Sequence, residues 1–314
     1  MLSTGKTSGL TKKQAYETQE IYVFCPNEDV ELVKASVEEL NIRLIFNELD
    51  VEGVKGKVIC HYKSSELPEK QREYLVLATE VGAWVEPLVS YLDHRLGYTT
   101  IELLHSGYFL HQRAFSILSD KKQEARKRIM DLLIATVIAV VTMPFMLLTV
   151  LLIKLESKGP IFYRQKRVGQ FNQEFNVIKF RSMQVDAEKD GAVWAKKNDV
   201  RVTRVGRFIR KTRIDELPQL VNVFKGEMSI VGPRPEREVF IRDLEKHIPY
   251  YRFRHAVKPG ITGLAQVKYP YGASVNDAKW KHRFDIHYIK HHRTLLDLKI
   301  VLMTVKVVFF GMGR

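Results

Sequence analysis

The chain contains very little cysteine, and its first residues contain no apolar stretch. Its 314 residues include only two cysteines, Cys25 and Cys60. Each lies in a short β-like apolar run, so we expect two buried thiols, not a disulfide or a metal pair. Residues 1–13 are polar and contain no apolar stretch, which argues against a cleavable secretory signal. These absences favour a protein whose soluble part lies in a reducing cytoplasm.

Repeats and low-complexity tracts are also missing, and a composition of 45% hydrophobic and 27% charged residues is globular. A length of 314 residues favours two domains over one. Neither a G-x-G-x-x-G sequence nor a P-loop occurs in residues 21–104. A nucleotide-binding role for this first part therefore has little support, and a regulatory or docking role is preferred.

Acidic residues are too few to balance the basic ones, with 36 against 50 and a net charge of +14 at pH 7. Such an excess indicates a partner of opposite charge, which is nucleic acid, anionic lipid or a phosphorylated substrate. Acidic residues are frequent before Leu104, whereas basic residues dominate from Lys121 onward. We therefore predict a boundary at 120/121, between a domain in residues 1–120 and a basic domain in residues 121–314.

The first domain alternates between short β-like runs and helical patterns, which indicates a small α/β layer. The predicted strands are residues 21–24, 42–46, 57–60 and 99–103. The predicted helices are residues 29–40, 68–79 and 85–96.

Residues 129–153 form an apolar run that is just long enough to cross a bilayer as a helix. Pro144 lies in the middle of this run, where it removes a backbone hydrogen bond and kinks a helix. Basic residues flank both ends, with Lys127 and Arg128 before the run and Lys154 after it. Because both flanks then prefer the cytoplasmic face, a proline-broken helix that enters and returns is favoured over a spanning helix.

The remainder of the basic domain is predicted to be mainly helical, with a short two-stranded element. We expect strands at 160–163 and 174–180 and helices at 204–213, 216–224 and 280–290. The tail at 295–310 is apolar but interrupted by charges, so it is either an interfacial amphipathic helix or a core helix.

Asp215 and Glu216 follow a stretch rich in arginine and lysine, residues 207–213. Adjacent cations lower the pKa of both carboxylates, which suits a nucleophile or a metal ligand. The alternative is that Asp215 caps the helix that begins at Glu216, and the local pattern alone favours the cap. The two roles are compatible, because a helix N-terminus also binds phosphate.

Several other segments combine basic residues with glycine or proline, which lets a backbone approach an oxyanion closely. They are residues 165–169, 179–181, 233–235 and 258–263, and each alone is typical of a turn. Four histidines, His282, His287, His291 and His292, suggest a metal site, but only His287 and His291 are spaced i, i+4 and no acid accompanies them in the pattern. A metal site at these histidines is not favoured.

Taken as an ordered set, these motifs resemble the bacterial sugar transferases known as monotopic phosphoglycosyl transferases, over about residues 121–314. The set comprises Lys127-Arg128-x-x-Asp131, the apolar run with Pro144, Pro160-Ile161-Phe162, Arg167-x-Gly169, Lys179-Phe180-Arg181-Ser182-Met183, Asp215-Glu216-Leu217-Pro218-Gln219-Leu220, Gly232-Pro233-Arg234-Pro235 and Pro259-Gly260-Ile261-Thr262-Gly263-Leu264-Ala265-Gln266. The resemblance implies an α/β N-terminal domain followed by a mainly α (α+β) monotopic membrane domain with a re-entrant helix.

The resemblance further implies an enzyme that transfers a sugar-1-phosphate from a UDP-sugar to undecaprenyl phosphate, releasing UMP in a Mg²⁺-dependent ping-pong reaction. Asp215 inherits the role of a covalent nucleophile, and Glu216 that of its acidic partner, with Mg²⁺ expected at these two acids. Substrate and phosphate binding is expected of Arg167, Lys179, Arg181, Arg210, Arg234, Gln266 and Lys268. Membrane anchoring is expected of Lys127, Arg128, Asp131 and Pro144.

One departure from the family pattern follows Gln266. Many members carry an Asn-Gly-Arg-like segment there, whereas this chain has Lys268-Tyr269-Pro270-Tyr271-Gly272. Pro270 cannot replace a guanidinium, and Lys268 is a substitute by charge alone. The variant resembles a subgroup linked to exopolysaccharide production, and the sugar itself stays open because selectivity rests on a few pocket contacts.

The expected location is the cytoplasmic face of the bacterial inner membrane, with its lipids and a homo-oligomer as further partners. Two other functions compete with this reading. A nucleic-acid binder would explain the basic charge, but the apolar run at 129–153 argues against it, so no nucleic-acid partner is expected. A non-catalytic membrane scaffold would explain the run but not the set of phosphate-binding motifs.

Overall fold

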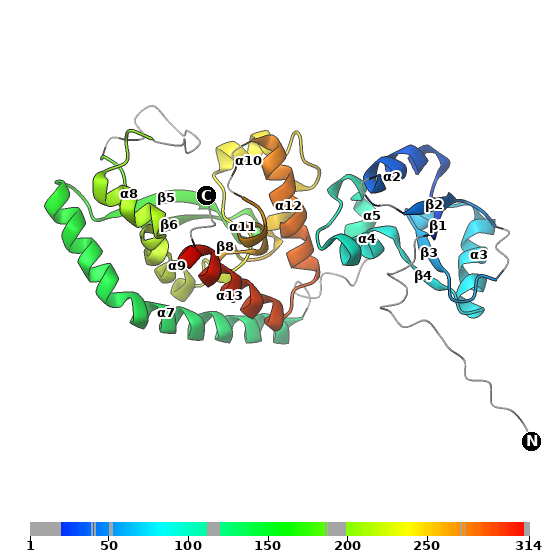
Figure 1. Ribbon diagram of the computed structural model, residues 1–314, viewed down its shortest axis with the longest axis horizontal. Coiled ribbons are helices and arrows are strands. Elements are labelled where there is room, and N and C mark those ends of the chain that lie inside the picture. The colour runs from blue at the N-terminus through cyan, green and yellow to red at the C-terminus, as the bar shows by residue number, and fades with distance from the viewer. Residues whose placement is uncertain are drawn as a thin grey trace, which may run out of the picture. The chain divides into compact units, whose positions relative to one another are not determined.

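The computed structural model describes residues 20–310, except 39, 41, 50–52, 112–119, 186, 188–198, 271 and 273. The chain forms two compact units, Met1–Gln112 and Arg113–Arg314, which we describe separately (Figure 1). The polar segment 1–13 and most of the residues next to the predicted boundary lie outside the described residues. The boundary at 120/121 therefore stays a prediction.

Unit 1 is built on a parallel sheet of four strands in the order β2-β1-β3-β4. The strands are β1 (Glu20–Phe24), β2 (Arg43–Phe46), β3 (Val58–His61) and β4 (Trp84–Pro87). The helices are α2 (Val30–Val37), α3 (Glu69–Glu80), α4 (Leu88–Leu96) and α5 (Ser106–His111), with short 3-10 turns η1 (Asn27–Asp29), η2 (Ser64–Glu66) and η3 (Ile101–Leu103). Parallel strands require crossover connections, and helices supply two of them. The predicted α/β layer is confirmed.

Two predictions in unit 1 need correction. The predicted helix at 85–96 is confirmed over residues 88–96, which form α4, but residues 85–87 belong to the strand β4. Pro87 ends this strand in an extended conformation and directly precedes the first helical residue. The predicted strand at 99–103 contains the 3-10 turn η3 instead. Cys25 and Cys60 are both free and buried, as expected.

Unit 2 is organised along one long helix, α7 (Lys121–Glu156), which contains Pro144 and bends along its course (Figure 1). The helix begins where the Asp120 carboxylate accepts hydrogen bonds from the backbone N–H groups of Lys122 and Gln123. Its 36 residues extend the predicted segment at both ends and correspond to about 54 Å of helix. Among the described residues it is the one helix long and apolar enough to cross a membrane, and only 11% of its most apolar 18-residue segment is buried.

The elements that carry the site lie on one side of α7 (Figure 1). The hairpin β5 (Phe162–Val168) and β6 (Glu174–Phe180) is antiparallel, with η4 (Gln170–Asn172) at its tip, and β7 (Ser229–Val231) pairs in parallel with β8 (Gly260–Thr262). Short helices follow the hairpin: α8 (Arg204–Lys211), η5 (Ile214–Gln219) and α9 (Leu220–Lys225). The later helices are α10 (Glu238–Leu244), η6 (Tyr251–Ala256), α11 (Leu264–Lys268), α12 (Val275–Lys290) and α13 (Thr294–Phe310).

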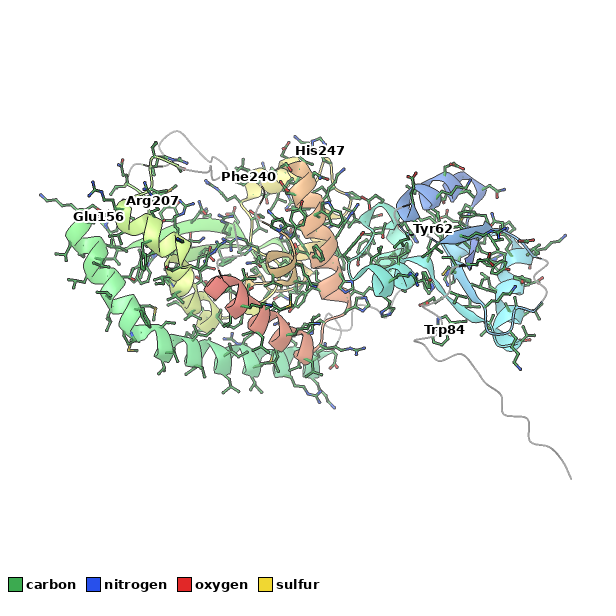
Figure 2. The ribbon with its side chains drawn as sticks, in the orientation of Figure 1. Tyr62, Trp84, Glu156, Arg207, Phe240 and His247 are labelled. Atoms are coloured by element: carbon green, nitrogen blue, oxygen red, sulfur yellow. The ribbon has the colours of Figure 1, made fainter. Side chains whose placement is uncertain are left out.

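Both ends of α7 are fastened to these elements. Near its start, the Arg128 guanidinium donates to the backbone carbonyls of Val223 and Phe224 at the end of α9. Asp131 accepts hydrogen bonds from the Ser229 hydroxyl and from the backbone N–H of Ile230 in β7. At the far end of α7, the Glu156 carboxylate accepts from the backbone N–H of Val205 in α8, and Figure 2 labels Glu156 at this end.

The tail helix α13 has one buried and one exposed side. Asp297 is fully buried, where it accepts hydrogen bonds from the Lys127 ammonium and the Tyr288 hydroxyl and lies 3.0 Å from His292 Nε2. The exposed side carries apolar residues, including Leu295 and Leu302. The interruption of the apolar pattern by Asp297 therefore marks a buried ionic network, not a water-facing surface.

Candidate active site

The short helix η5 carries the Asp215-Glu216 pair. The chain enters it through Arg213, which adopts a left-handed conformation (φ 59°), and the helix contains Pro218. Arg213 occupies the N-cap position and no side chain caps the helix, so the alternative that Asp215 is a cap is wrong. Both carboxylates are buried, at 7% and 8% exposure, which is costly unless they are paired or functional.

Glu216 is surrounded by cations. Its Oε1 atom lies 3.1 Å from Lys179 Nζ at the end of β6 and 2.6 Å from Arg234 Nη2, and Oε2 lies 3.4 Å from Arg234 Nη1. Arg213 Nη1 is 3.9 Å away. Burial raises the pKa of Glu216, but the charges of Arg234 and Lys179 outweigh it and hold that pKa well below its ordinary value. Glu216 is therefore a fixed anion.

The pKa of Asp215 is shifted in the opposite direction. Its Oδ1 atom is buried and has no hydrogen-bond partner among the residues that the structure describes. Burial and the adjacent negative charge of Glu216 raise the pKa of Asp215 to about 6, although Lys179, Arg213 and Arg210 oppose this. The prediction that nearby cations lower the pKa of both acids is right for Glu216 and wrong for Asp215, because burial and the charge of Glu216 outweigh the cations at Asp215.

The turn at 232–236 brings Arg234 to Glu216. A Cβ atom at Gly232 would overlap the backbone carbonyl of Lys258, and one at Gly260 would overlap the backbone N of Gly232, so the two segments touch through bare backbone. The Gly260 N–H donates to the carbonyl of Pro233 at 3.0 Å. The glycines predicted as phosphate-binding turns thus join β7 and β8 beneath Arg234.

Three more of the predicted binding residues lie at or near this pair. Lys179 and Arg234 contact Glu216 directly. Arg210 acts on Asp215 through its charge. The structure therefore brings together Lys179, Arg210, Arg234, Asp215 and Glu216 from four segments of the sequence.

The other predicted binding residues have different partners. Arg181 donates to the carbonyls of Ser157 and Lys158, where it caps the end of α7. Arg167 donates to the Pro235 carbonyl and pairs with Glu236 at 3.2 Å. These two guanidinium groups hold protein backbone in place of a phosphate.

Gln266 and Lys268 lie on α11. The Gln266 amide donates to the Ile261 carbonyl at 2.9 Å, while its buried Oε1 atom has no partner in the described part of the chain. Lys268 is exposed. Neither residue contacts the Asp215-Glu216 pair through a hydrogen bond or ion pair that the structure describes.

The two acids fit a magnesium ion only in part. Mg²⁺ in phosphate-transferring sites is held by one or two carboxylates together with substrate phosphates and water. The unpartnered Asp215 Oδ1 supplies one such oxygen. The Glu216 oxygens are bonded to Arg234 and Lys179, so Glu216 would act as a second ligand only after exchanging one of these bonds.

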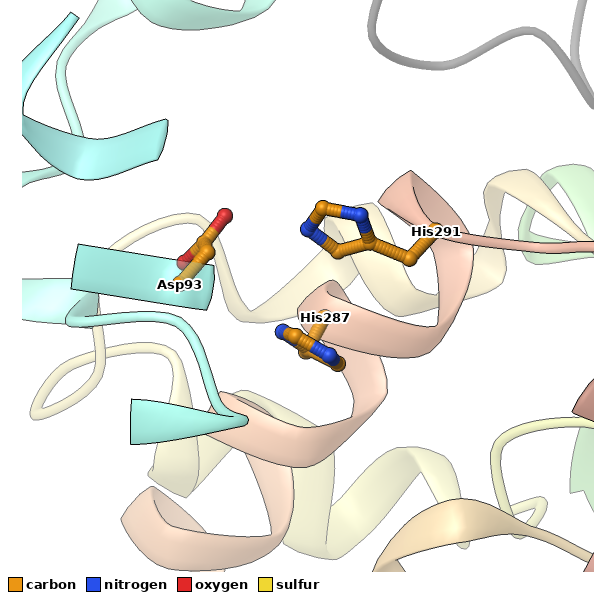
Figure 3. Close-up of side chains that lie close together, drawn as sticks. All are labelled: Asp93, His287 and His291. Carbon is orange, nitrogen blue, oxygen red and sulfur yellow. The ribbon is translucent and has the colours of Figure 1, made fainter. Parts of the chain in front are cut away.

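The four histidines are distributed along and after α12. His287 and His291 lie one turn apart, with ring centroids 4.4 Å from each other (Figure 3). His282 is fully buried, and burial lowers its pKa to about 3. His292 lies in the Asp297 network. None of the four lies in the Asp215-Glu216 cluster as described.

Sequence reasoning missed the buried ion pair between Arg254 and Asp285, which contacts the backbone of Arg234. Arg254 Nη2 in η6 lies 2.8 Å from Asp285 Oδ2 in α12, and both side chains are at most 4% exposed. The same guanidinium donates to the backbone carbonyl of Arg234 at 3.0 Å and to the Tyr251 hydroxyl at 2.7 Å. A sequence separation of 31 residues between the two charges gave no local signal for this pair.

Comparison with known proteins places this cluster in a family. Residues 122–311 match the family model described as bacterial sugar transferase. An Aeromonas hydrophila protein described as UDP-N-acetylgalactosamine-undecaprenyl-phosphate N-acetylgalactosaminephosphotransferase is 48% identical over 187 residues, which is 60% of this chain and 44% of that protein. This chain therefore spans less than half of that relative.

Two further relatives are covered almost completely. A Caulobacter vibrioides protein described as UDP-glucose:undecaprenyl-phosphate glucose-1-phosphate transferase is 38% identical over 230 residues, covering 72% of this chain and 86% of the relative. The exopolysaccharide production protein PSS of Rhizobium leguminosarum bv. phaseoli is 40% identical over 186 residues, covering 57% of this chain and 92% of that protein. The matched family region contains every residue of the Asp215-Glu216 cluster. The chain belongs to the bacterial sugar transferase family.

Proposed function

We propose that the protein transfers a sugar-1-phosphate from a UDP-sugar to undecaprenyl phosphate through a covalent intermediate on Asp215, releasing UMP. The observation that carries this proposal is the contrast between the two acids. Glu216 is fixed by Arg234 and Lys179, whereas Asp215 is buried beside them with an unpartnered oxygen. A desolvated carboxylate next to a ring of cations suits attack on a phosphate whose charge those cations neutralise.

The reaction has two displacement steps. The Asp215 carboxylate attacks the β-phosphorus of the UDP-sugar, an oxygen–phosphorus bond forms, and the bond from that phosphorus to the bridging oxygen breaks, so UMP leaves with the electron pair. An oxygen of undecaprenyl phosphate then attacks the same phosphorus and returns the carboxylate. Each step needs only one large anion in the site.

The other residues hold charge and geometry. Lys179 and Arg234 pair with Glu216. When the substrate enters, each can move one of its hydrogen bonds from Glu216 to a phosphate oxygen. Arg210 raises the share of ionised Asp215 through its charge. A bound Mg²⁺ would further neutralise the diphosphate, with Asp215 and, after exchange, Glu216 as its protein ligands.

The exposed apolar surface of α7 supports the proposed membrane placement. Most of its apolar side chains are exposed, for example Leu133, Val137 and Leu147 at 62–65%, and a bilayer is the environment that removes such a surface from water. Basic residues flank both ends, so the proposed arrangement is a re-entrant helix that bends at Pro144 and keeps both ends at the cytoplasmic face of the inner membrane. The exposed apolar side of α13 would lie at the membrane surface.

The proposal is tested with the full chain in detergent, Mg²⁺ and a panel of UDP-sugars, first without and then with undecaprenyl phosphate. Without the lipid, at least one UDP-sugar is expected to release about one UMP per protein and to leave a phosphosugar on the peptide that contains Asp215. Adding the lipid gives continued release. No UMP from any UDP-sugar would instead support a non-catalytic membrane scaffold.

The pH dependence gives a separate prediction. Asp215 must be ionised to attack, and burial raises its pKa to about 6. We therefore expect kcat/KM for UMP release to rise with pH through about 6 and to level off above it, because kcat/KM reports groups of the free enzyme.

Removing a charge near Asp215 tests whether the rise of kcat/KM with pH, the acid limb of the profile, reports the ionisation of Asp215. Replacing Arg210 with Gln removes one of the charges that lower the Asp215 pKa, so the limb is expected to move to higher pH. Lys211→Gln is the matched control, since it removes an exposed charge from the next position of α8. Equal shifts in the two variants would contradict the assignment of the limb to Asp215.

A further inference from the structure

The turn that carries Arg234, residues 232–236, is not stabilised by a regular set of internal backbone hydrogen bonds. Pro233 and Pro235 have no backbone N–H, so residues 232–236 cannot form a regular hydrogen-bonded ladder of their own. Their carbonyls still need donors, because they are buried or partly buried. The shape of the turn is therefore set by groups from other elements.

Each carbonyl from Pro233 to Glu236 accepts a hydrogen bond from a donor outside the turn. The Pro233 carbonyl accepts from the Gly260 N–H, and the Glu236 carbonyl accepts from the Val168 N–H at 2.9 Å. The Arg234 and Pro235 carbonyls instead accept from side chains, which are the guanidinium groups of Arg254 and Arg167.

Arg254 is the buried member of these two side chains. It is 4% exposed and pairs with Asp285, which is 2% exposed. Removing two charges from water is expensive, and such a pair is often no more stable than apolar residues of the same size. The pair therefore suggests a role other than stability. Among the hydrogen bonds described for Arg254, the bond to the Arg234 carbonyl leads toward the Asp215-Glu216 cluster.

We infer that Arg254, held by Asp285, is a positioning residue for the transfer reaction, because it fixes the backbone of Arg234 so that the Arg234 guanidinium meets Glu216. The chain of contacts is short: Asp285 Oδ2 to Arg254 Nη2 at 2.8 Å, Arg254 Nη2 to the Arg234 carbonyl at 3.0 Å, and Arg234 Nη2 to Glu216 Oε1 at 2.6 Å. This inference rests on the proposed function.

The geometry of a guanidinium explains why arginine is needed here. Its planar fork directs several N–H groups at once. Arg254 donates through Nη1 to the Tyr251 hydroxyl and through Nη2 to the Arg234 carbonyl, and Nη2 also forms the ion pair with Asp285. A lysine keeps the charge that Asp285 requires, but its compact ammonium is not matched to all three acceptors. Arg254→Lys therefore separates the positioning role from the loss of a buried charge.

The test measures UMP release by the full chain in detergent for Arg254→Lys, Arg234→Lys and the double variant. We expect Arg254→Lys to lower kcat by about 10-fold or more with little change in KM, since small misplacements at a reacting centre have effects of that order. Once Arg234 is replaced, adding Arg254→Lys should change kcat by less than about twofold, because coupled residues are not additive.

Arg252→Lys is the matched control on the same short helix. Arg252 is also ion-paired, with Glu238 and Glu245, and its described hydrogen bonds and ion pairs do not include residues 232–236. The kcat of Arg252→Lys should therefore stay within about twofold of wild type. If Arg254→Lys does not fold, Asp285→Asn, which keeps the side-chain shape, is used in its place with the same expectation.

The outcomes are distinct. An inactive wild type would overturn the proposed function and this inference with it. An active wild type with effects of Arg254→Lys and Arg234→Lys that multiply, or with no loss in Arg254→Lys, would overturn the positioning role alone.

Discussion

Replacing Asp215 with Asn is expected to lower UMP release by at least about 10³-fold and to abolish the phosphosugar adduct, because an amide cannot act as the nucleophile. The fold should persist. Asp215 Oδ1 has no hydrogen-bond partner among the described residues, and burial raises the pKa of this acid to about 6, so its charge is disfavoured in the folded state. The thermal unfolding temperature of Asp215→Asn should therefore be no lower than that of wild type.

The measurement is a UMP-release assay together with mass analysis of the peptide that contains residue 215. Asp243→Asn is the control, because Asp243 lies on α10 in an exposed pair with Lys246. The variant Asp243→Asn should retain wild-type turnover. Normal turnover in Asp215→Asn, or an adduct on another residue, would remove Asp215 from the nucleophile role.

Replacing Gly260 with Ala is expected to destabilise unit 2 and to stop UMP release. The new Cβ atom would overlap the backbone N and O of Gly232 and the backbone O of Thr262, and backbone atoms cannot rotate away as a side chain can. Overpacking usually costs about 1–3 kcal/mol, and an overlap with three backbone atoms should reach the upper end of that range or exceed it. The displaced Gly232 backbone would also carry Arg234 away from Glu216.

Thermal unfolding and UMP release of the detergent-solubilised chain measure the two effects. Gly53→Ala is the matched substitution in unit 1, where a Cβ meets no atom within 4 Å and the cost is limited to the positive φ of 70°, about 1 kcal/mol. A Gly260→Ala protein that keeps both the unfolding temperature and the activity of wild type would show that the two turns do not touch as described.

Periodicity was sufficient for several helices of unit 2, but the short elements β7, α10, η6, β8 and α11 were not predicted. The structure places α8, α12 and α13 within a few residues of the predicted helices at 204–213, 280–290 and 295–310. The errors in unit 1 fall on short segments, β4 and η3, where three or four residues carry too little pattern to separate strand from helix.

The sequence indicated which residues form the site, but it did not indicate which partners they pair with. Basic residues around an acidic pair indicated charge stabilisation, yet the sequence could not show that Glu216 takes both Lys179 and Arg234 while Asp215 takes neither. The same limit applies to Arg181, whose place in a basic motif suggested phosphate binding although its partners are carbonyls at the end of α7. Partner choice depends on tertiary geometry, which local pattern does not encode.

The Lys127 network also constrains how the chain is made. Lys127 lies near the start of α7, and its buried partner Asp297 follows 170 residues later, so at about 5–20 residues per second the ribosome delivers that partner roughly 10 to 30 seconds afterwards. Asp131, one turn further along α7 and 3.6 Å from Lys127 Nζ, is present from the outset. During synthesis Lys127 can thus pair with Asp131 inside α7 before the helix reaches the bilayer of the proposed arrangement. The arrival of α13 then adds Asp297 and completes the charge balance.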